Sequence, residues 1–501
     1  MKKSDSNNSI AHNAFSRIIM YILNLLVPVV IGPYLARVLD VELYAQYNTA
    51  LSIAQWFLPI AVFGIYNYGM RQASRERENQ IETGRVFTKL FVFGLISTTS
   101  ALAVYFLFVF TFKRSELGLY SLLSINIIAN YFAIEWLNEA FENYKFILYK
   151  TMLVRLAYVV SIFIFVRKPE DILPYTGIAS GVIFFNNFLG YIYVRRKVKF
   201  VKVSFREIIS LTQPLFVVML LTNTNMLFLM LDRLFLSVFA SEKIFVTYYT
   251  MAMLITMAIM NVASSIFYVA VPRLSNYLAS GNLEEYKKLL ASSSHAFFLV
   301  AMPIFAGVAT LGREIMYVYG GEKYLGAGST LAVFGIMFMV YAIDLSLANQ
   351  VLFVRGMENL LLVIYLAGGG VNLAINIVLL ISGNLTPTLL IATTLVADLV
   401  VVGLQHYIAK RSFGKDHSTL NIKMLKYVVF SLCFPLIGYA FRHFFDARVN
   451  VLTGFSFVKY VTCVVISCVV FYFLALLISR DAYLLKTLKN IHGRIKGVDK
   501  E

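Results

Sequence analysis

The side chains best suited to chemistry in this sequence are charged residues that interrupt long apolar runs. Asp232 and Arg233 are adjacent within the run LFLMLDRLFLSVF. If the run is helical, the two side chains point about 100° apart, so they can face different surroundings. The planar guanidinium of Arg233 could hold a diphosphate through paired hydrogen bonds. The alternative is a structural charge pair with a neighbouring helix.

Further basic residues lie at or near the ends of apolar runs. Each could help to bind an anion, and each also has a simpler interpretation. A long cationic side chain at a helix end can reach the aqueous boundary or contact anionic lipid. These candidates are Arg37, Arg71, Arg273, Lys89 and Arg155.

Four acidic residues suggest coupling or gating. Asp344 and Asp398 lie near the middle of their apolar runs, where a carboxyl group could carry a proton or bind sodium, or could form a hydrogen-bonded helix contact. Glu135 and Glu139 lie one helical turn apart, within possible reach of Arg155. They could form a gating ion pair or a plain structural pair.

Other polar and small residues inside the runs leave two interpretations open. Asn372 and Asn376 could hydrogen-bond sugar hydroxyls or join neighbouring helices. Trp56 could stack on a sugar ring, as could Tyr66 and Tyr68. The triplet at 368–370 is all glycine, which weakens a helix by roughly 1 kcal/mol per residue relative to alanine and indicates a close helix approach or a bend.

The composition shows what solvent these runs need. The chain has 501 residues, of which 59% are hydrophobic and 14% charged, and its mean hydropathy is +0.73. Soluble domains carry roughly 25% charged residues. A chain of this length cannot hide so much apolar surface from water, whereas a lipid-facing surface needs no polar coat. A water-soluble enzyme is therefore excluded, and we expect an all-α polytopic membrane protein.

Apolar runs of about 20 residues predict membrane-spanning helices. We find fourteen candidates. They lie near 15–36, 44–69, 87–110, 118–137, 151–166, 173–194, 211–238, 245–271, 293–312, 329–353, 360–381, 388–408, 425–441 and 457–478.

The basic residues predict how these spans are oriented. With the N-terminus inside, the inner segments hold 29 of the 44 Lys and Arg residues and the outer loops hold 10. This excess is typical of a protein with both termini in the cytoplasm. It also explains the net charge of +17 and the pI of about 9.5 without a nucleic-acid partner.

Catalytic and cofactor motifs are missing from the sequence. The three cysteines lie in apolar stretches without a CxxC pair or a Cys/His cluster, so we expect no disulfide and no metal site. There is no GxxxxGK[ST] loop, and the loops are too short for a soluble catalytic domain. We expect a transporter and not an enzyme, with no cofactor and with possible proton or sodium coupling.

A weak repeat suggests two lobes. Tyr47 precedes Arg71 by 24 residues, and Tyr249 precedes Arg273 by 24 residues. Six spans separate the copies, which would give two parallel six-helix lobes. We predict an N-lobe at 1–194, a basic cytoplasmic linker at 195–210, a C-lobe at 211–409, and a C-terminal helix pair with a basic tail at 410–501.

The stretch from Pro33 to Ser74, PYLARVLDVELYAQYNTALSIAQWFLPIAVFGIYNYGMRQAS, resembles the signature of Wzx-type polysaccharide-unit flippases. Three further segments share the resemblance: EWLNEAFENYKFILYKTMLVR at 135–155, LDR at 231–233 and VPRLSNYLASGNLEEYKKLL at 271–290. It is specific at the N-terminus and diffuse after residue 300. Asp40 departs from it, because the family usually has glycine there.

The resemblance implies a member of the multidrug/oligosaccharidyl-lipid/polysaccharide exporter superfamily, with two six-helix lobes around a central cavity. Such a protein would move undecaprenyl-pyrophosphate-linked oligosaccharide units from the inner to the outer leaflet of a bacterial inner membrane by alternating access. Its product would serve O-antigen of lipopolysaccharide, capsule or exopolysaccharide biosynthesis. Membrane lipids, a glycan polymerase and chain-length machinery would be its partners.

Two other functions stay open at this point. A cation antiporter of the multidrug and toxin extrusion type would need an acidic cavity, but these spans offer basic residues as readily as acidic ones. A polytopic glycan polymerase or ligase would be expected to have a large outer loop, and every predicted outer loop here is short.

Overall fold

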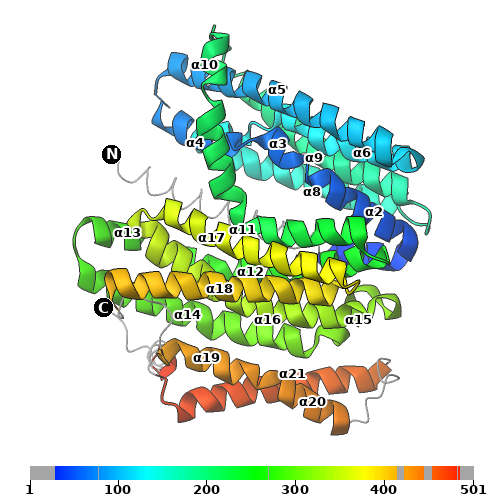
Figure 1. Cartoon of the computed structure of the whole chain (residues 1–501), viewed down its shortest axis with the longest axis vertical. Coiled ribbons are helices and arrows are strands. Elements are labelled where there is room, and N and C mark those ends of the chain that lie inside the picture. Colours follow the sequence, from blue (N-terminus) through cyan, green and yellow to red (C-terminus); the bar gives the residue numbers. More distant parts are fainter. Residues whose placement is uncertain are drawn as a thin grey trace. The chain divides into compact units, whose positions relative to one another are not determined.

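The computed structural model describes residues 29–76, 78–268, 270–414, 422–444, 454–481 and 483–485, without the side chains of 221–227, 265–268, 422–423, 444 and 454–455. Within these ranges all regular secondary structure is helical (Figure 1), which confirms the predicted all-α class. The chain divides into two compact units, Met1–Thr247 and Tyr248–Glu501.

Within the described residues, the first helix of the first unit is the short helix Val29–Val38. Its other helices are α2 (Val41–Gln55), α3 (Leu58–Val62), α4 (Ile65–Arg75), α5 (Gln80–Phe112), η1 (Arg114–Glu116), α6 (Leu117–Ile128), η2 (Ala129–Phe132), α7 (Glu135–Ala140), α8 (Tyr144–Phe165), α9 (Ile172–Arg195), α10 (Phe205–Ile209) and α11 (Thr212–Phe239).

The second unit begins at Tyr248, within α12 (Ile244–Tyr268), so the first turn of this helix belongs to the first unit. Its further helices are α13 (Val271–Ala279), α14 (Leu283–Thr310), α15 (Gly312–Gly320), η3 (Glu322–Tyr324), α16 (Ala327–Ser346), the π-helix η4 (Leu347–Leu352), η5 (Phe353–Arg355), α17 (Glu358–Ile381), α18 (Pro387–Phe413), α19 (Ile422–Leu432), α20 (Phe434–Phe444) and α21 (Gly454–Ile478).

Among the described residues, 12 helices or helix series are long and apolar enough to cross a membrane. They coincide with twelve of the fourteen predicted spans. Of the remaining two, the seventh corresponds to the 28-residue helix α11. The first, at 15–36, lies mostly outside the described residues. The protein is thus a multi-pass membrane protein, and the count of fourteen stays a prediction.

The predicted second span is not one helix, because it breaks into α2, α3 and α4. Gly64 stands between α3 and α4 with a φ of +75°, a conformation that favours glycine. A Cβ atom at this position would lie 2.5 Å from the backbone oxygen of Leu215 at the start of α11. The break therefore lets the α11 backbone approach the junction directly.

Two other expectations about helix shape can be compared with the structure. The predicted fourth span is interrupted before Glu135, where α7 begins. Helix α17 instead continues without a break through the glycine triplet at 368–370. A Cβ atom added at Gly370 would meet nothing within 4 Å, so Gly370 marks neither a bend nor a close contact.

Each unit has its own packed interior. In the first, the ring of Trp136 on α7 is buried with Phe87 and Leu215, and Gly69 of α4 leaves room for that ring. In the second, α14, α16 and α18 pack side by side (Figure 1). The C-terminal helices α19 and α20 pack against α14.

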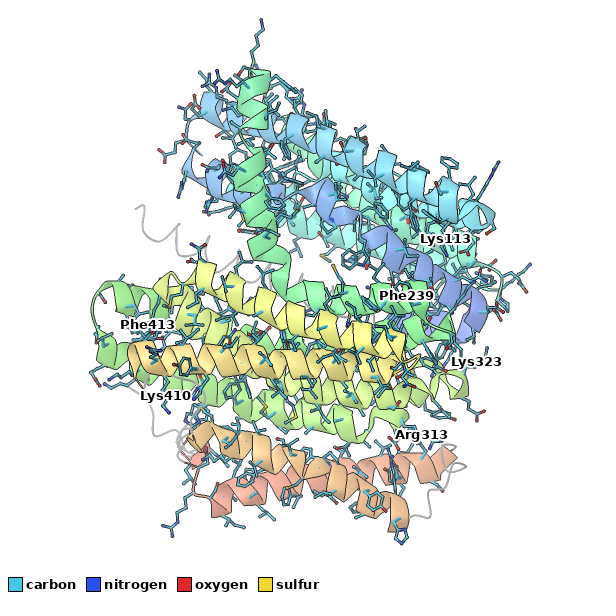
Figure 2. All side chains as sticks on the ribbon, viewed as in Figure 1. Lys113, Phe239, Arg313, Lys323, Lys410 and Phe413 are labelled. Carbon is cyan, nitrogen blue, oxygen red and sulfur yellow. The ribbon has the colours of Figure 1, made fainter. Side chains whose placement is uncertain are left out.

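The predicted orientation assigns the loop between the spans at 293–312 and 329–353 to the outer side of the membrane, and the segment after the span at 388–408 to the inner side. Arg313 and Lys323 lie at one end of the helices of the second unit and Lys410 lies at the other (Figure 2).

The boundary between the two units falls after Thr247, so α11 groups with the first unit. The lobe limits at 194 and 211 stay a prediction.

Candidate functional site

The first candidate cluster surrounds Arg233 in α11. Its side chain is only 6% exposed, and Asp232 beside it is fully buried. The two terminal nitrogens of the guanidinium donate hydrogen bonds to α2, to Gln55 Oε1 at 2.9 Å and to Ser52 Oγ at 2.7 Å. Arg233 therefore does not extend to an aqueous boundary but is held by polar groups inside the first unit.

The polar groups that hold Arg233 form one stripe along α2. Asn48, Ser52 and Gln55 are spaced by four and three residues, which places them on one helix face. Ser52 Oγ donates to the backbone oxygen of Asn48 at 2.7 Å, and Asn48 Nδ2 donates to Thr247 Oγ1 at 3.1 Å. Sequence reasoning missed this stripe, although its spacing in an apolar helix was a usable signal.

A second cluster joins α7, α8 and α9 through a buried ion pair. Lys150 Nζ lies 2.7 Å from Glu135 Oε2, and the lysine side chain is only 2% exposed. Asn138 Nδ2 also donates to the same carboxylate oxygen, at 3.5 Å. Gly190 packs directly against this pair, since a Cβ atom there would lie 2.9 Å from Glu135 Oε2.

Glu135 and Glu139 have different partners in the structure. The sequence suggested that both could reach Arg155, but the ion partner of Glu135 is Lys150 on the same helix as Arg155. Glu139 accepts a hydrogen bond of 2.5 Å from the hydroxyl of Tyr66 in α4. Lys150 lies in the predicted inner segment between the spans at 118–137 and 151–166, where the sequence indicates a topology charge and does not predict its burial. The side chain of Arg155 is half-buried in α8.

Lys89 is engaged by the segment that leads into α11. Its Nζ lies 2.9 Å from Glu207 Oε1 in α10. Ser204 and Glu207 form a capping box, in which the Glu207 carboxylate also accepts the backbone N–H of Ser204 at 2.8 Å. This N–H, Lys89 and the Ser204 hydroxyl lower the pKa of Glu207 to about 2. Lys89 thus ties α5 to the predicted cytoplasmic linker.

The remaining basic candidates lie at the surface. Arg37, Arg71 and Arg273 are exposed, and the guanidinium of Arg71 lies 5.8 Å from the ring centre of Tyr68. Near Arg37, the carboxylate of Asp40 caps α2 by accepting the backbone N–H groups of Glu42 and Leu43. The departure from the family glycine at Asp40 is thus a helix cap.

Asp344 is the centre of a buried polar cluster in the second unit. It is 1% exposed in α16. It accepts hydrogen bonds from the hydroxyl of Tyr365 in α17 at 3.0 Å and from Gln405 Nε2 in α18 at 2.6 Å. Asp398 is 6% exposed and lies seven residues before Gln405 on α18. The structure therefore places both acids inside the helix bundle, where charge is tolerated only with polar partners.

Two asparagines join α17 to α18. Asn372 Nδ2 donates to Thr393 and Thr394, at 3.2 and 3.0 Å. Asn376 Oδ1 accepts the Thr393 hydroxyl at 2.6 Å. Both asparagines are fully buried, so in this structure they connect helices.

Of the aromatic candidates, Trp56 Nε1 donates to the backbone oxygen of Met230 at 3.3 Å.

Comparisons with known proteins agree with this architecture. A Shigella dysenteriae protein named "Putative O-antigen transporter" is 25% identical over 358 residues, which cover 70% of this chain and 88% of that protein. The solved structure titled "Lipid II flippase MurJ, inward closed conformation" superposes with a TM-score of 0.69 and 14% identity, covering 94% of this chain and 99% of the other. At this identity the second likeness concerns the fold alone. Both names describe transporters.

The family assignment comes from a match that covers the N-terminal half of the chain and continues to residue 278. Residues 10–278 match the sequence model of the family described as "Polysaccharide biosynthesis protein". This range contains the Pro33–Ser74 stretch and the LDR segment at 231–233 that carry the resemblance to Wzx-type flippases. Since the match spans more than half of the chain, the protein belongs to the polysaccharide biosynthesis protein family.

Proposed function

We propose that this protein is a flippase for lipid-linked glycans in surface polysaccharide biosynthesis. Its substrate would be an oligosaccharide unit linked to undecaprenyl pyrophosphate, moved from the inner to the outer leaflet of a bacterial inner membrane by alternating access. The observation that carries the proposal is the family match over residues 10–278. The name of the Shigella relative and the flippase fold support it.

Arg233 is the residue that we assign to the substrate diphosphate. An ionisable side chain inside a membrane bundle marks a functional site by default, because burying it is unfavourable by several kcal/mol. Two of its hydrogen bonds go to neutral acceptors, Gln55 and Ser52, which phosphate oxygens can replace. Phosphate offers the guanidinium stronger, charge-assisted hydrogen bonds. The stripe on α2 would therefore orient Arg233 until substrate arrives.

Asp344 and Asp398 are the proposed coupling residues. Asp344 accepts hydrogen bonds from Tyr365 and Gln405, so α17 and α18 each supply one donor to the carboxylate. Taking up a proton would weaken both bonds and loosen α16 from α17 and α18. Protonation driven by a gradient could thus change the packing of the second unit, and sodium is the alternative ion.

The proposed orientation places both termini in the cytoplasm. It is supported by the excess of Lys and Arg in the predicted inner segments. In this orientation the glycan would be delivered to the outer face, where a polymerase and chain-length machinery would act on it.

The proposal is tested in a strain that lacks the gene and is complemented with variants. We expect surface polysaccharide to be lost in the deletion strain and restored by the wild-type gene. If lipid-linked units still reach the outer leaflet at the normal rate without the gene, the flippase assignment is wrong. Transport into proteoliposomes under imposed pH and sodium gradients then identifies the coupling ion.

The assigned role of Arg233 has its own test. Arg233→Ala, at normal protein level in the membrane, is expected to reduce export strongly. Arg114→Ala is the matched control, because Arg114 is an exposed arginine in the same unit. Undiminished export by Arg233→Ala would overturn the assignment of Arg233 while leaving the flippase proposal in place.

A further inference from the structure

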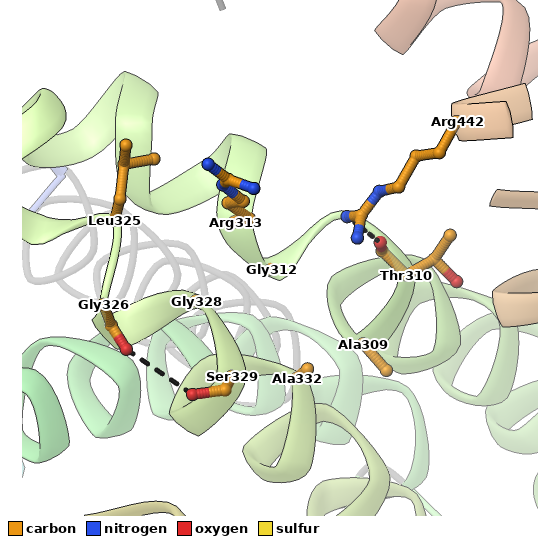
Figure 3. A pocket seen from close by; sticks show the side chains of 10 residues that line it. All are labelled: Ala309, Thr310, Gly312, Arg313, Leu325, Gly326, Gly328, Ser329, Ala332 and Arg442. Carbon is orange, nitrogen blue, oxygen red and sulfur yellow. Dashed lines mark hydrogen bonds between the residues drawn. The ribbon is translucent and has the colours of Figure 1, made fainter. Parts of the chain in front are cut away.

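The second unit contains a pocket of about 510 Å³ that none of the predicted site residues lines (Figure 3). Its walls come from the end of α14, the start of α15, the start of α16 and helix α20. Two arginines line it, Arg313 from α15 and Arg442 from α20. Both arginines directly follow predicted spans, at 293–312 and 425–441, and the predicted orientation places them on the outer side of the membrane.

Arg442 is held in a fixed position by its neighbours. Its Nη2 lies 3.1 Å from both carboxylate oxygens of the buried Glu314, and its Nε donates to the hydroxyl of Tyr460 at 3.2 Å. The backbone oxygen of Thr310 accepts a further bond from Nη2 at 3.4 Å. An arginine has five N–H donors, and within the described part of the chain the two on Nη1 have no partner. The guanidinium is thus held through Nε and Nη2, and its Nη1 is available to a ligand in the pocket.

Arg313 adds a second positive charge that is not compensated locally. It is half-buried, and no ion pair or hydrogen bond joins its side chain to the described residues. The adjacent Glu314 is already paired with Arg442, so the two arginines and this one carboxylate leave a net positive charge at the pocket. An anion is the ligand that this charge favours.

The beginning of α16 contributes to the same wall. Gly326, Gly328 and Ser329 line the pocket and belong to the N-terminal end of this 20-residue helix. No side chain caps this end, and its first turn has no acidic residue. The positive end of the helix dipole therefore faces the pocket together with the two arginines.

The surroundings of Arg442 are those of a lipid-facing helix. Gly438 lies one turn before Arg442, and a Cβ atom there would lie 2.4 Å from the Thr310 side chain, so this face of α20 packs on α14. Leu436 and Tyr439 on α20 are 71% and 74% exposed. Since α20 belongs to a helix series apolar enough to span a membrane, these exposed side chains are suited to contact acyl chains. The arginine pocket then lies where a lipid headgroup would be.

We propose that this pocket binds the phosphate group of a membrane lipid, with Arg313 and Arg442 as its donors. The phosphate would accept hydrogen bonds from Nη1 of Arg442 and from the Arg313 guanidinium, while the acyl chains lie along α20. The site differs from the one assigned to Arg233, which belongs to the first unit. It does not depend on which glycan the protein carries.

The test compares lipid binding by the full-length protein and two charge variants in detergent. Native mass spectrometry measures retention of short-chain phosphatidic acid, with diacylglycerol of the same chain length as the comparison that lacks a phosphate group. Arg313→Ala leaves the Arg442–Glu314 pair intact, and it is expected to weaken phosphatidic acid binding about tenfold, the effect of one charge-assisted hydrogen bond. Lys323→Ala is the matched control, because Lys323 is exposed at the same end of the unit but does not line the pocket.

Three outcomes decide the proposal. Selective loss of phosphatidic acid in Arg313→Ala supports it, and equal binding by Arg313→Ala and Lys323→Ala overturns it. Inorganic pyrophosphate is the competitor that represents a free anion. If it displaces phosphatidic acid with an affinity equal to that of the lipid, the ligand is a free phosphate compound and the assignment to a lipid is wrong. Should Arg313→Ala fail to accumulate, Ser329→Phe fills the pocket without a charge change and must produce the same loss.

Discussion

Removing either member of the Lys150–Glu135 ion pair is expected to destabilise the first unit, and removing Glu135 should do more damage. Breaking a buried ion pair destabilises a protein by about 3–5 kcal/mol, because one charge stays buried without its partner. Lys150 is 2% exposed and Glu135 is 20% exposed. The lysine left by Glu135→Met can recruit little water, so this variant should lose about 3–4 kcal/mol.

The opposite substitution should be milder. In Lys150→Met, the remaining carboxylate keeps partial access to water and the amide of Asn138, which lies 3.5 Å away. We expect a loss of about 2 kcal/mol for this variant. Combining the two substitutions places two apolar side chains of similar size against Gly190, so the double variant should be more stable than Glu135→Met alone.

The measurement is the free energy of unfolding in a titration with denaturing detergent, followed by circular dichroism. Lys145→Met is the matched control, because Lys145 is exposed on the same helix and its loss should change stability by less than about 0.5 kcal/mol. The reasoning is refuted if Lys150→Met is the more damaging single change. It is also refuted if the double variant loses the sum of both single effects.

Four further results are expected. Arg233→Lys should fail to restore polysaccharide export, because an ammonium group cannot reproduce the forked contact with Gln55 and Ser52; normal export would contradict this. The pKa of Glu207 is lowered from 4.5 to about 2. The stability difference between wild type and Glu207→Gln should therefore be constant above pH 4.5 and disappear as the pH falls through 2. Thermal unfolding measured across this pH range checks the prediction. Gly370→Ala should stabilise α17 by up to about 1 kcal/mol, and a lower melting temperature would contradict the open space at this position. Asp40→Ala should lose about 1 kcal/mol and Asp40→Gly only a few tenths, as measured by the same unfolding assay.

Helix positions were predictable because a membrane requires about 20 apolar residues per span. The breaks within spans were not predictable, because they depend on contacts with helices that are distant in the sequence. In the sequence, Gly64 is one small residue in an apolar run. Only the structure shows that the Leu215 backbone at the start of α11 packs against it. Similarly, Asp40 looked like a departure from a family pattern, although its position before an apolar helix is typical of an N-cap.

The candidate site was predictable only in part, for a related reason. A charge inside an apolar run is visible in the sequence, which is how Arg233, Asp344 and Asp398 were found. A charge at the edge of a run looks like a topology anchor, and Lys150 was assigned to that class although its side chain is buried against Glu135. Distinguishing the two requires knowing that the predicted fourth span is interrupted before Glu135, where α7 begins, and that this acid pairs with Lys150 of α8.

Arg233 and Arg442 show how the partners of an arginine bear on its function. Arg442 is bound to the carboxylate of the buried Glu314, and displacing that carboxylate would leave a charge without its partner inside the second unit. Two of the Arg233 hydrogen bonds instead go to the neutral side chains of Gln55 and Ser52, each worth about 1 kcal/mol net, and phosphate oxygens can replace them without leaving a carboxylate behind. These two hydrogen bonds are thus compatible with binding and release of a diphosphate in every cycle, whereas the Arg442–Glu314 pair is suited to holding a resident lipid.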